Sequence, residues 1–345
     1  MKKKINWGII GLGNIANKFA EGFSMADNAN ITGIASLNKD NLKSFQKKFQ
    51  IPNELCFNDY DNLISSPNID IIYIALPNSL HFTYIKKSIK QKKNVLVEKP
   101  AFTNIQDFRN IKNLLNNEKI FFTEAFMYRY LPYIKKIKEL IQSNQLGKPI
   151  NMESIFNIKV YKQKKFFGLR IMKPDYNHRL FNKVLGGGAI LDVGCYPLSL
   201  STLVNSLTYN VELNSISLEN TKSEYCESGV EIASEVVLNF NNKFKSKISC
   251  SFKNKQNQQT IIQFENGSLN IDQSWLPSQD MSIKLKKGNE ISKINFRNDK
   301  NIYSYQIKNI SDQLLNNSMT PSFPSMTIKE IEINTKILND WINLK

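Results

Sequence analysis

A glycine-rich turn lies between a short apolar strand and a helix at the start of the 345-residue chain. The strand is expected over Asn6–Ile10, and the pattern Gly11-Leu12-Gly13-Asn14-Ile15-Ala16 follows it at once. Apolar residues then recur with helical spacing to about Met25. In this strand–turn–helix context, Gly-x-Gly-x-x-Gly/Ala binds the pyrophosphate of a dinucleotide. The pattern therefore predicts a Rossmann fold.

Each position of the pattern has a separate physical task. Gly11 permits the tight turn, Gly13 lets a pyrophosphate approach the backbone, and Ala16 allows close packing of helix and strand. The helix N-terminus adds N–H donors and the positive end of a dipole. We therefore predict cofactor contacts at Gly11, Gly13, Asn14, Ile15 and Ala16.

The first half of the chain continues with strands and helices in alternation, which implies a parallel sheet with right-handed crossovers. Further strands are expected at Asn30–Ala35, Asp70–Ala75, Asn94–Val97 and Ile120–Thr123, with helices at Leu42–Phe49, Asp59–Ile64, His81–Gln91 and Gln106–Asn116. The strand Asp70–Ala75 ends in Leu76-Pro77-Asn78, and His81 follows. We predict that these four residues line the cofactor crevice, although His81 could equally be a packed histidine on its rim.

The end of the second strand bears on the choice between NAD and NADP. An NAD site usually has an acidic residue there, about 20 residues after the glycines, to bind the ribose hydroxyls. This chain has Ser36-Leu37-Asn38-Lys39 instead. Ser36 could donate to a 2′-phosphate and Lys39 could neutralise it, although Lys39 could also be a solvated lysine at a helix start. We predict a preference for NADP(H) over NAD(H).

After residue 123 the pattern changes to a helix, Leu131–Ser143, followed mainly by alternating strands. The sequence therefore predicts an α/β N-terminal Rossmann domain, residues 1–123, with a doubly wound parallel sheet. It also predicts a C-terminal α+β domain, residues 124–345, with a large, mostly antiparallel open sheet. Its strands are expected at Asn151–Tyr161, Val211–Leu218, Ile232–Phe240, Lys245–Phe252, Gln259–Phe264, Ser268–Asp272, Met281–Lys286 and Glu290–Phe296, with a hairpin turn at Asn266-Gly267 and helices at Ile302–Leu315 and Thr327–Asn343.

A charged pair follows the buried strand Asn94–Val97. Glu98 and Lys99 come directly after Val97, and Pro100 ends the strand. In an open α/β sheet, ligands lie beyond the carboxyl ends of the strands. The pair is thus placed to reach the ligand crevice, although a lone Glu-Lys could also be a solvated strand end.

A second glycine-rich segment, Leu185-Gly186-Gly187-Gly188-Ala189-Ile190-Leu191-Asp192-Val193-Gly194-Cys195-Tyr196-Pro197, lies in the second half. The glycines allow a backbone to lie against a ligand, and the apolar run indicates the start of a buried helix. Asp192 and Tyr196 are four residues apart, hence on one helical face. They are either catalytic groups or a structural hydrogen-bonded pair.

Composition excludes several classes of function. No apolar run is long enough to span a membrane. The chain starts with basic residues, but the apolar stretch after them is too short and too interrupted by glycine for a signal peptide, so we expect a cytoplasmic protein. Four scattered cysteines and two histidines predict no metal site. The net charge of +16 comes from lysines spread along the chain. It predicts a positive field that attracts anionic cofactors, not nucleic-acid binding.

Several of these segments together resemble the glucose–fructose oxidoreductase/inositol dehydrogenase (Gfo/Idh/MocA) family. GLGNIA, ALPNSLH, EKP, EAFMYRY and LGGGAILDVGCYP occur in the family's order and at suitable spacing across essentially the whole chain. The last two are most similar to the branch with dihydrodiol and xylose dehydrogenases. Leu37, however, replaces an arginine common in NADP-binding members.

The resemblance implies site residues and an assembly. Lys99 would lie beside the nicotinamide and substrate, with Asp192 and Tyr196 completing the catalytic group, and the bond before Pro100 would be cis. Glu98 and Arg179 are expected at the cofactor. Substrate contacts are expected from Lys99, Arg129, Asp192 and Tyr196. The outer face of the sheet would form a homodimer or homotetramer.

The predicted reaction is hydride transfer between NAD(P) and a secondary alcohol, or the matching ketone, of a sugar, polyol or cyclic diol. A nearby ammonium favours the phenolate of a tyrosine, so Lys99 could make Tyr196 a proton donor or acceptor near neutral pH. A non-catalytic, cofactor-binding regulator or scaffold of the same fold is the alternative. It predicts loss of the catalytic positions, and Lys99, Asp192 and Tyr196 are all present.

Overall fold

The computed structural model describes residues 3–161, 164–166, 170–172, 174–209, 216–241, 243–253, 255–298 and 300–344. Contacts divide the chain into two compact units, each built from two stretches. The first unit is Met1–Leu131 with Asp299–Ile331, and the second is Pro132–Asn298 with Glu332–Lys345. These units differ from the continuous domains 1–123 and 124–345, because a late helix packs with the N-terminal stretch. The assignment of function to those two domains stays a prediction.

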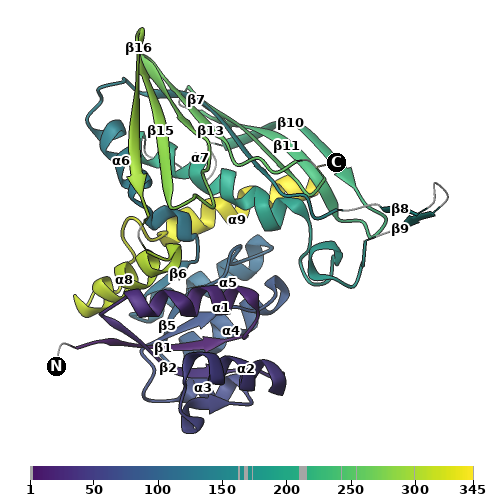
Figure 1. Ribbon diagram of the computed structural model, residues 1–345, viewed down its shortest axis with the longest axis vertical. Helices are drawn as coiled ribbons and strands as arrows, with labels where there is room; N and C mark the ends of the chain where they lie inside the picture. The colour runs from purple at the N-terminus through teal and green to yellow at the C-terminus, as the bar shows by residue number, and fades with distance from the viewer. Residues whose placement is uncertain are drawn as a thin grey trace. The chain divides into compact units, whose positions relative to one another are not determined.

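The first unit contains a six-stranded parallel sheet with the order β3-β2-β1-β4-β5-β6 (Figure 1). This confirms the predicted Rossmann sheet. Its order reverses between β1 and β4, the point at which open α/β sheets bind ligands. The strands are β1 Ile5–Ile10, β2 Ala29–Ala35, β3 Cys56–Phe57, β4 Ile71–Ile74, β5 Asn94–Val97 and β6 Phe122–Glu124.

Several helices of this unit begin at a polar side chain that caps them. Asn38, Asp59 and Asn104 each accept hydrogen bonds from N–H groups of the following turn, which satisfies donors that a helix start leaves unpaired. The helices are α1 Asn14–Glu21, α2 Lys39–Phe49, α3 Tyr60–Ser65, α4 Asn78–Lys90, α5 Ile105–Asn117 and α8 Ile302–Leu315, with 3₁₀ turns at Gly22–Met25, Asn53–Leu55 and Met127–Tyr130.

Helix α8 completes the first unit from far along the chain. The indole Nε1 of Trp7 in β1 donates to Ser311 Oγ at 3.0 Å, and both residues are fully buried. Asn28 Nδ2 donates to the Lys308 carbonyl and to Asp312. These polar contacts to buried groups fix α8 against the N-terminal stretch.

The second unit contains an eight-stranded sheet with the order β10-β11-β12-β7-β13-β14-β15-β16 (Figure 1). Among the strands that the structure describes in this sheet, only β12 and β7 pair in parallel, which confirms the predicted mostly antiparallel sheet. Its strands are β7 Pro149–Asn157, β10 Ile216–Tyr225, β11 Glu231–Phe240, β12 Phe244–Ser251, β13 Thr260–Phe264, β14 Gly267–Ile271, β15 Asp280–Lys287 and β16 Glu290–Arg297. The remaining elements are a small pair, β8 Lys164–Phe166 and β9 Arg170–Met172, the helices α6 Pro132–Gln142, α7 Cys195–Thr208 and α9 Ile328–Asn343, and a 3₁₀ turn at Arg179–Phe181.

Two predicted strands differ from the observed ones by more than two residues at an end, and the short strands β3, β8 and β9 were not predicted. The strand expected over Asn151–Tyr161 ends at Asn157. Residues 211–215 of the strand expected at Val211–Leu218 lie outside the described residues, and β10 extends to Tyr225. The extension is polar and forms an edge of the sheet, so it lacks the apolar alternation that indicates a half-buried strand.

Candidate active site

The residues predicted to bind the pyrophosphate lie together at the carboxyl edge of the parallel sheet. Gly11 has φ +85°, and a Cβ there would come within 2.5 Å of the Ala75 carbonyl oxygen, so the turn requires glycine. Ala16 is fully buried. A Cβ on Gly13, by contrast, would meet no atom within 4 Å. Internal packing therefore does not demand glycine at position 13, whereas close approach of a ligand would.

Helix α1 starts at this point without a capping side chain. Gly13 is its N-cap residue, and the first turn contains no acidic residue. Its unpaired N–H groups and the positive end of its dipole suit an anion. The residues present thus fit a dinucleotide pyrophosphate.

Ser36 and Lys39 follow β2, the neighbour of β1 in the sheet. Ser36 is buried, and its Oγ accepts from Asn38 N at 3.2 Å. Lys39 is exposed and is the first residue of α2. The structure thus confirms that the two residues lie at the edge that carries the glycine turn, and the contact to a 2′-phosphate stays a prediction.

His81 joins the segments that follow β4 and β5. It is fully buried in the first turn of α4. Its Nε2 lies 2.9 Å from the Leu76 carbonyl oxygen and its Nδ1 lies 2.9 Å from the Pro100 carbonyl oxygen. Burial lowers the pKa of His81, carbonyl contacts oppose this, and the charge of Lys99 lowers it further. His81 therefore holds the backbone on both sides of the predicted crevice.

Lys99 follows β5, and the peptide bond between Lys99 and Pro100 is cis, as predicted. The carboxylate of Glu98 is buried and accepts hydrogen bonds from the Tyr73 hydroxyl and the Lys99 N–H. These hydrogen bonds within the protein occupy both carboxylate oxygens of Glu98. Its predicted contact with the cofactor stays a prediction.

A buried carboxyl group that the sequence did not single out lies next to Lys99. Glu124, at the end of β6, accepts from the Ala101 N–H at 2.9 Å. Burial raises the pKa of Glu124 to about 7, although this hydrogen bond and the charges of Arg129 and Lys99 lower it. Glu124 thus fixes the backbone two residues after Lys99.

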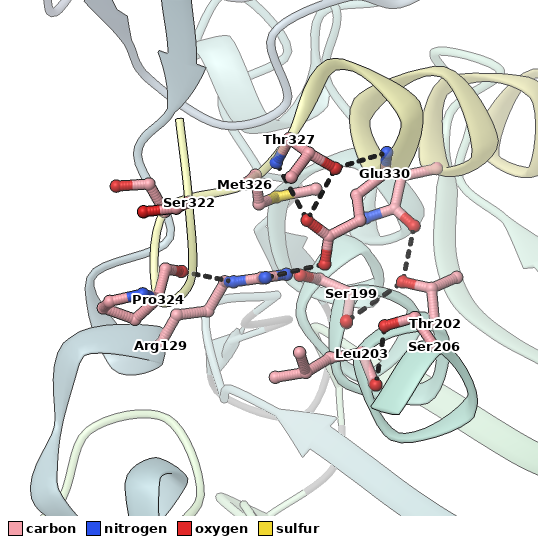
Figure 2. Close-up of polar contacts among 12 residues, drawn as sticks. Arg129, Ser199, Thr202, Leu203, Ser206, Ser322, Pro324, Met326, Thr327 and Glu330 are labelled. Carbon is pink, nitrogen blue, oxygen red and sulfur yellow. Dashed lines mark hydrogen bonds and ion pairs between the residues drawn. The ribbon is translucent and has the colours of Figure 1, made fainter. Parts of the chain in front are cut away.

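Arg129, which was predicted to bind substrate, is buried among structural partners. Its side chain is 1% exposed, its Nε donates to the Pro324 carbonyl at 2.9 Å, and its Nη2 forms a 2.7 Å ion pair with Glu330 (Figure 2). Glu330 also accepts from the N–H and hydroxyl of Thr327. A guanidinium held inside the first unit in this way has a structural role, and its predicted contact with substrate stays a prediction.

The second unit carries Asp192 and Tyr196 on one continuous helix. Residues Ile190–Gly194 form a π-helical turn that leads directly into α7. Asp192 Oδ1 lies 3.2 Å from Arg179 Nη1. The sequence predicted Arg179 at the cofactor and gave no sign of this ion pair, because the partners are 13 residues apart in an irregular segment. The cofactor contact stays a prediction.

Tyr196 is 7% exposed and packs among aromatic rings of the second unit. Its ring lies edge-on to Phe156 at 5.2 Å and 5.8 Å from Trp275. These contacts restrict its side chain to a narrow set of orientations. Lys99 belongs to the first unit and Tyr196 to the second, and their joint action stays a prediction.

Two further properties concern the described residues only. No helix among them is long and apolar enough to cross a membrane. None of their His, Cys, Asp and Glu side chains gather in a group of three that could hold a metal ion.

Comparison with known proteins gives matches over both halves of the chain. A model of the Gfo/Idh/MocA oxidoreductase family, with an NAD-binding Rossmann fold, matches residues 5–126. A model of a Gfo/Idh/MocA C-terminal domain matches residues 134–270.

Among curated relatives, trans-1,2-dihydrobenzene-1,2-diol dehydrogenase of Xenopus tropicalis is 25% identical over 342 residues, covering 97% of this chain and 96% of the relative. D-xylose 1-dehydrogenase (NADP(+)) of Hypocrea jecorina is 29% identical over 205 residues, covering 56% of this chain and 51% of the relative.

Two solved structures share the fold over nearly the whole chain. KijD10, a 3-ketoreductase from Actinomadura kijaniata in complex with NADP and TDP-benzene, has a TM-score of 0.79 at 17% identity, covering 98% of this chain and 96% of that chain. Aldose-aldose oxidoreductase from Caulobacter crescentus, complexed with glycerol, has a TM-score of 0.83 at 17% identity with the same coverage.

Proposed function

Because the chain belongs to the Gfo/Idh/MocA oxidoreductase family, whose N-terminal domain binds a nicotinamide dinucleotide, we propose that it oxidises a secondary alcohol or reduces the matching ketone of a sugar, polyol or cyclic diol. The names of its relatives support this substrate class, since they act on a dihydrodiol and on xylose. The observation that carries the proposal is the position of Lys99. It follows β5 at the edge that also holds the glycine turn.

The cofactor would be held by the turn Gly11–Ala16, the start of α1 and the segment Leu76–Asn78. Ser36 and Lys39 would bind a 2′-phosphate, so the proposed preference is NADP(H). When bound, the nicotinamide supplies the chemistry that moves a hydride to or from the substrate carbon. The protein has to orient that carbon and transfer a proton.

Tyr196 is proposed to transfer the proton and Lys99 to stabilise its phenolate. A positive charge near a phenol favours the ionised form, which brings proton transfer into the neutral range. Asp192 would orient this pair or hold a substrate hydroxyl. The ion pair of Asp192 with Arg179 supports the orienting role, because it limits where the carboxylate points.

Replacing Lys99 tests the mechanism. We expect Lys99→Met to bind NADPH like the unchanged protein and to lose turnover by several orders of magnitude, because the phenolate loses its stabilising charge. Turnover would be followed by nicotinamide absorbance in a screen of polyols, aldoses and keto-sugars. Lys90→Met, at the exposed end of α4, is the matched control. Equal rates in the Lys99 and Lys90 variants on the same substrate would remove Lys99 from the mechanism.

Fluorescence titration with NADPH and NADH tests the cofactor preference. We expect tighter binding of NADPH, and we expect Lys39→Ala to weaken NADPH binding while leaving NADH binding nearly unchanged. The reason is that only NADPH carries the phosphate that Lys39 would neutralise. Tighter binding of NADH would reverse the assignment of Ser36 and Lys39.

The proposed assembly is a homodimer or homotetramer formed through the outer face of the eight-stranded sheet. The predicted field of the +16 net charge would favour anionic cofactors and substrates. No nucleic-acid partner is proposed.

A further inference from the structure

The helix that carries Asp192 and Tyr196 begins without a local capping side chain. Its first turn follows Gly186-Gly187-Gly188-Ala189, and Ala189 at the N-cap position offers no side-chain acceptor. The first N–H groups of a helix have no partner within the helix, and leaving them unpaired when buried is costly. Ala189 and Ile190 are both buried, so the acceptor has to come from elsewhere in the fold.

Glu231, the first residue of β11, supplies that acceptor. Its Oε1 accepts from the Ile190 N–H at 3.0 Å. Its carboxyl group also lies directly against Gly188, because a Cβ built on Gly188 would come within 2.2 Å of Oε1 and 2.8 Å of Oε2. Glu231 is only 5% exposed. We call Glu231, Gly188 and Ile190 together the Glu231 clasp.

The glycine segment is held from a second side by backbone carbonyls of the turn that carries Arg179. Gly187 N donates to the Asn182 carbonyl and Gly188 N to the Leu180 carbonyl, both at 2.9 Å. Asp192 N then donates to the Gly188 carbonyl at 3.0 Å. Movement of Gly188 would therefore be transmitted to Asp192 directly and to the Arg179 turn.

We propose that Glu231 is a positioning residue, which holds the start of the helix carrying Asp192 and Tyr196 and makes the placement of these two side chains depend on pH. The catalytic part of this proposal rests on the proposed function, whereas the structural part does not. Glu231 acts through the backbone of Gly188 and Ile190. It is assigned no contact with substrate or cofactor.

The charges around Glu231 determine the direction of the pH effect. Burial raises the pKa of Glu231 to about 7, although the N–H groups of Glu231 and Ile190 and the charge of Lys183 lower it. The other facing group is Cys250 on β12, itself beside Cys195. Burial raises the pKa of the Cys250 thiol well above its usual value, so this thiol stays neutral at pH 7.

Opening of the clasp becomes easier as pH rises. When the glycine segment lifts away, Glu231 meets water and its pKa returns toward the ordinary value of about 4.5. The closed form therefore binds the proton more strongly than the open form, and its advantage declines as pH rises through 7. Between pH 5.5 and 8.5 the opening equilibrium should increase about thirtyfold.

Hydrogen exchange measured by mass spectrometry on the full chain tests the structural part. After correction for intrinsic exchange, we expect protection of peptides within 186–196 to fall about thirtyfold from pH 5.5 to 8.5. The hairpin β13–β14, residues 260–271, provides an internal reference. A flat profile at 186–196 in the unchanged protein would overturn the proposal without any variant.

The variant Glu231→Gln keeps the shape and an oxygen acceptor and cannot ionise. We expect it to remove the pH dependence of exchange, whereas Glu235→Gln, on the same strand and paired with Lys247, should retain it. If Glu231→Gln retained it as well, the pH effect would not come from Glu231.

The catalytic part is tested by the pH profile of kcat on any substrate that the screen finds. We expect a transition near pH 7 that Glu231→Gln removes and Glu235→Gln keeps. The same kcat profile in the unchanged protein and in Glu231→Gln would overturn the positioning role. If the exchange results hold and the protein turns over none of the substrates, the proposed function fails and the pH-dependent clasp stands.

Discussion

Glu124 illustrates how a single buried carboxyl group connects the stability of this protein with pH. It is 3% exposed and accepts from the Ala101 N–H. Because burial raises its pKa to about 7 in the folded chain, against about 4.5 when unfolded, the folded state binds the proton more strongly. The stability that results is complete below about pH 4.5 and is lost as pH rises through 7.

Replacing this group should remove that pH dependence. We expect the free energy of unfolding of the unchanged protein, relative to Glu124→Gln, to fall by about 2 kcal/mol between pH 5 and pH 8. Urea denaturation of both proteins at several pH values would measure it. Glu54→Gln, at an exposed position, is the control and should show no such trend. If the free energies of unfolding of the unchanged protein and of Glu124→Gln differed by the same amount at every pH, Glu124 would be ionised throughout this range.

Residues could be assigned from the sequence where their role depends on neighbours in the chain. The tight turn at Gly11 and the helix start at Gly13 could be predicted, since both features are local. The ion pair of Arg129 could not be predicted, because its partner Glu330 is 201 residues away. Glu231 and Glu124 were overlooked for the same reason. Burial raises the pKa of each carboxyl group, and each accepts from an N–H group that is distant in the sequence. Neither burial nor this N–H group can be recognised from the neighbouring residues in the chain.

At the scale of elements, the turn before α7 illustrates a glycine that the fold requires. Gly188 has φ +120° and lies against the Glu231 carboxyl group. We expect Gly188→Ala to lower the free energy of unfolding by about 2–4 kcal/mol, from backbone strain together with the collision. Chemical denaturation would measure the loss.

Gly229→Ala is the matched control for this effect. Gly229 also has a positive φ, +77°, but a Cβ there would meet no atom within 4 Å. It should therefore cost only the backbone strain, about 1 kcal/mol. Equal losses in the two variants would show that the Glu231 side chain moves aside, and the clasp would then be too weak to position a helix.

Most elements could be predicted from the sequence, because apolar periodicity is strong in the buried strands of both sheets. β4 and β5 are wholly or mostly buried and have the continuous apolar runs that parallel strands show. The polar half of β10 could not be predicted. It is a strand because its backbone pairs with β11, and its side chains are not buried in the pattern that would indicate a strand. The π-helical turn at Ile190–Gly194 could not either, since its caps come from Glu231 and from backbone carbonyls.

At the scale of the whole molecule, the sequence order of the elements conceals how the compact units are assembled. The change of sequence pattern after residue 123 predicts the end of the N-terminal domain there, whereas the first compact unit also includes Asp299–Ile331. An amphipathic helix such as α8 shows that one face is buried and does not show which part of the chain covers it. Contacts such as those of Trp7 and Asn28 with α8 reveal the partner.

This organisation predicts the behaviour of fragments. A fragment of residues 1–131 alone should fail to fold cooperatively, because it leaves the Trp7 indole and the Asn28 amide without their partners on α8. It also leaves the buried Arg129 guanidinium without Glu330 and the Pro324 carbonyl. Each such unpaired buried group costs about 1–3 kcal/mol, and more when it is charged.

A second fragment, in which residues 1–131 are joined to residues 300–331 by a flexible Gly/Ser linker of about 15 residues, restores all of these partners. We expect it to unfold cooperatively in urea and to bind NADPH. Trp7 is the only tryptophan in either fragment, so its fluorescence reports on this core alone. If residues 1–131 by themselves unfolded cooperatively with the same free energy as the joined fragment, α8 would be an accessory to the Rossmann core and not part of it.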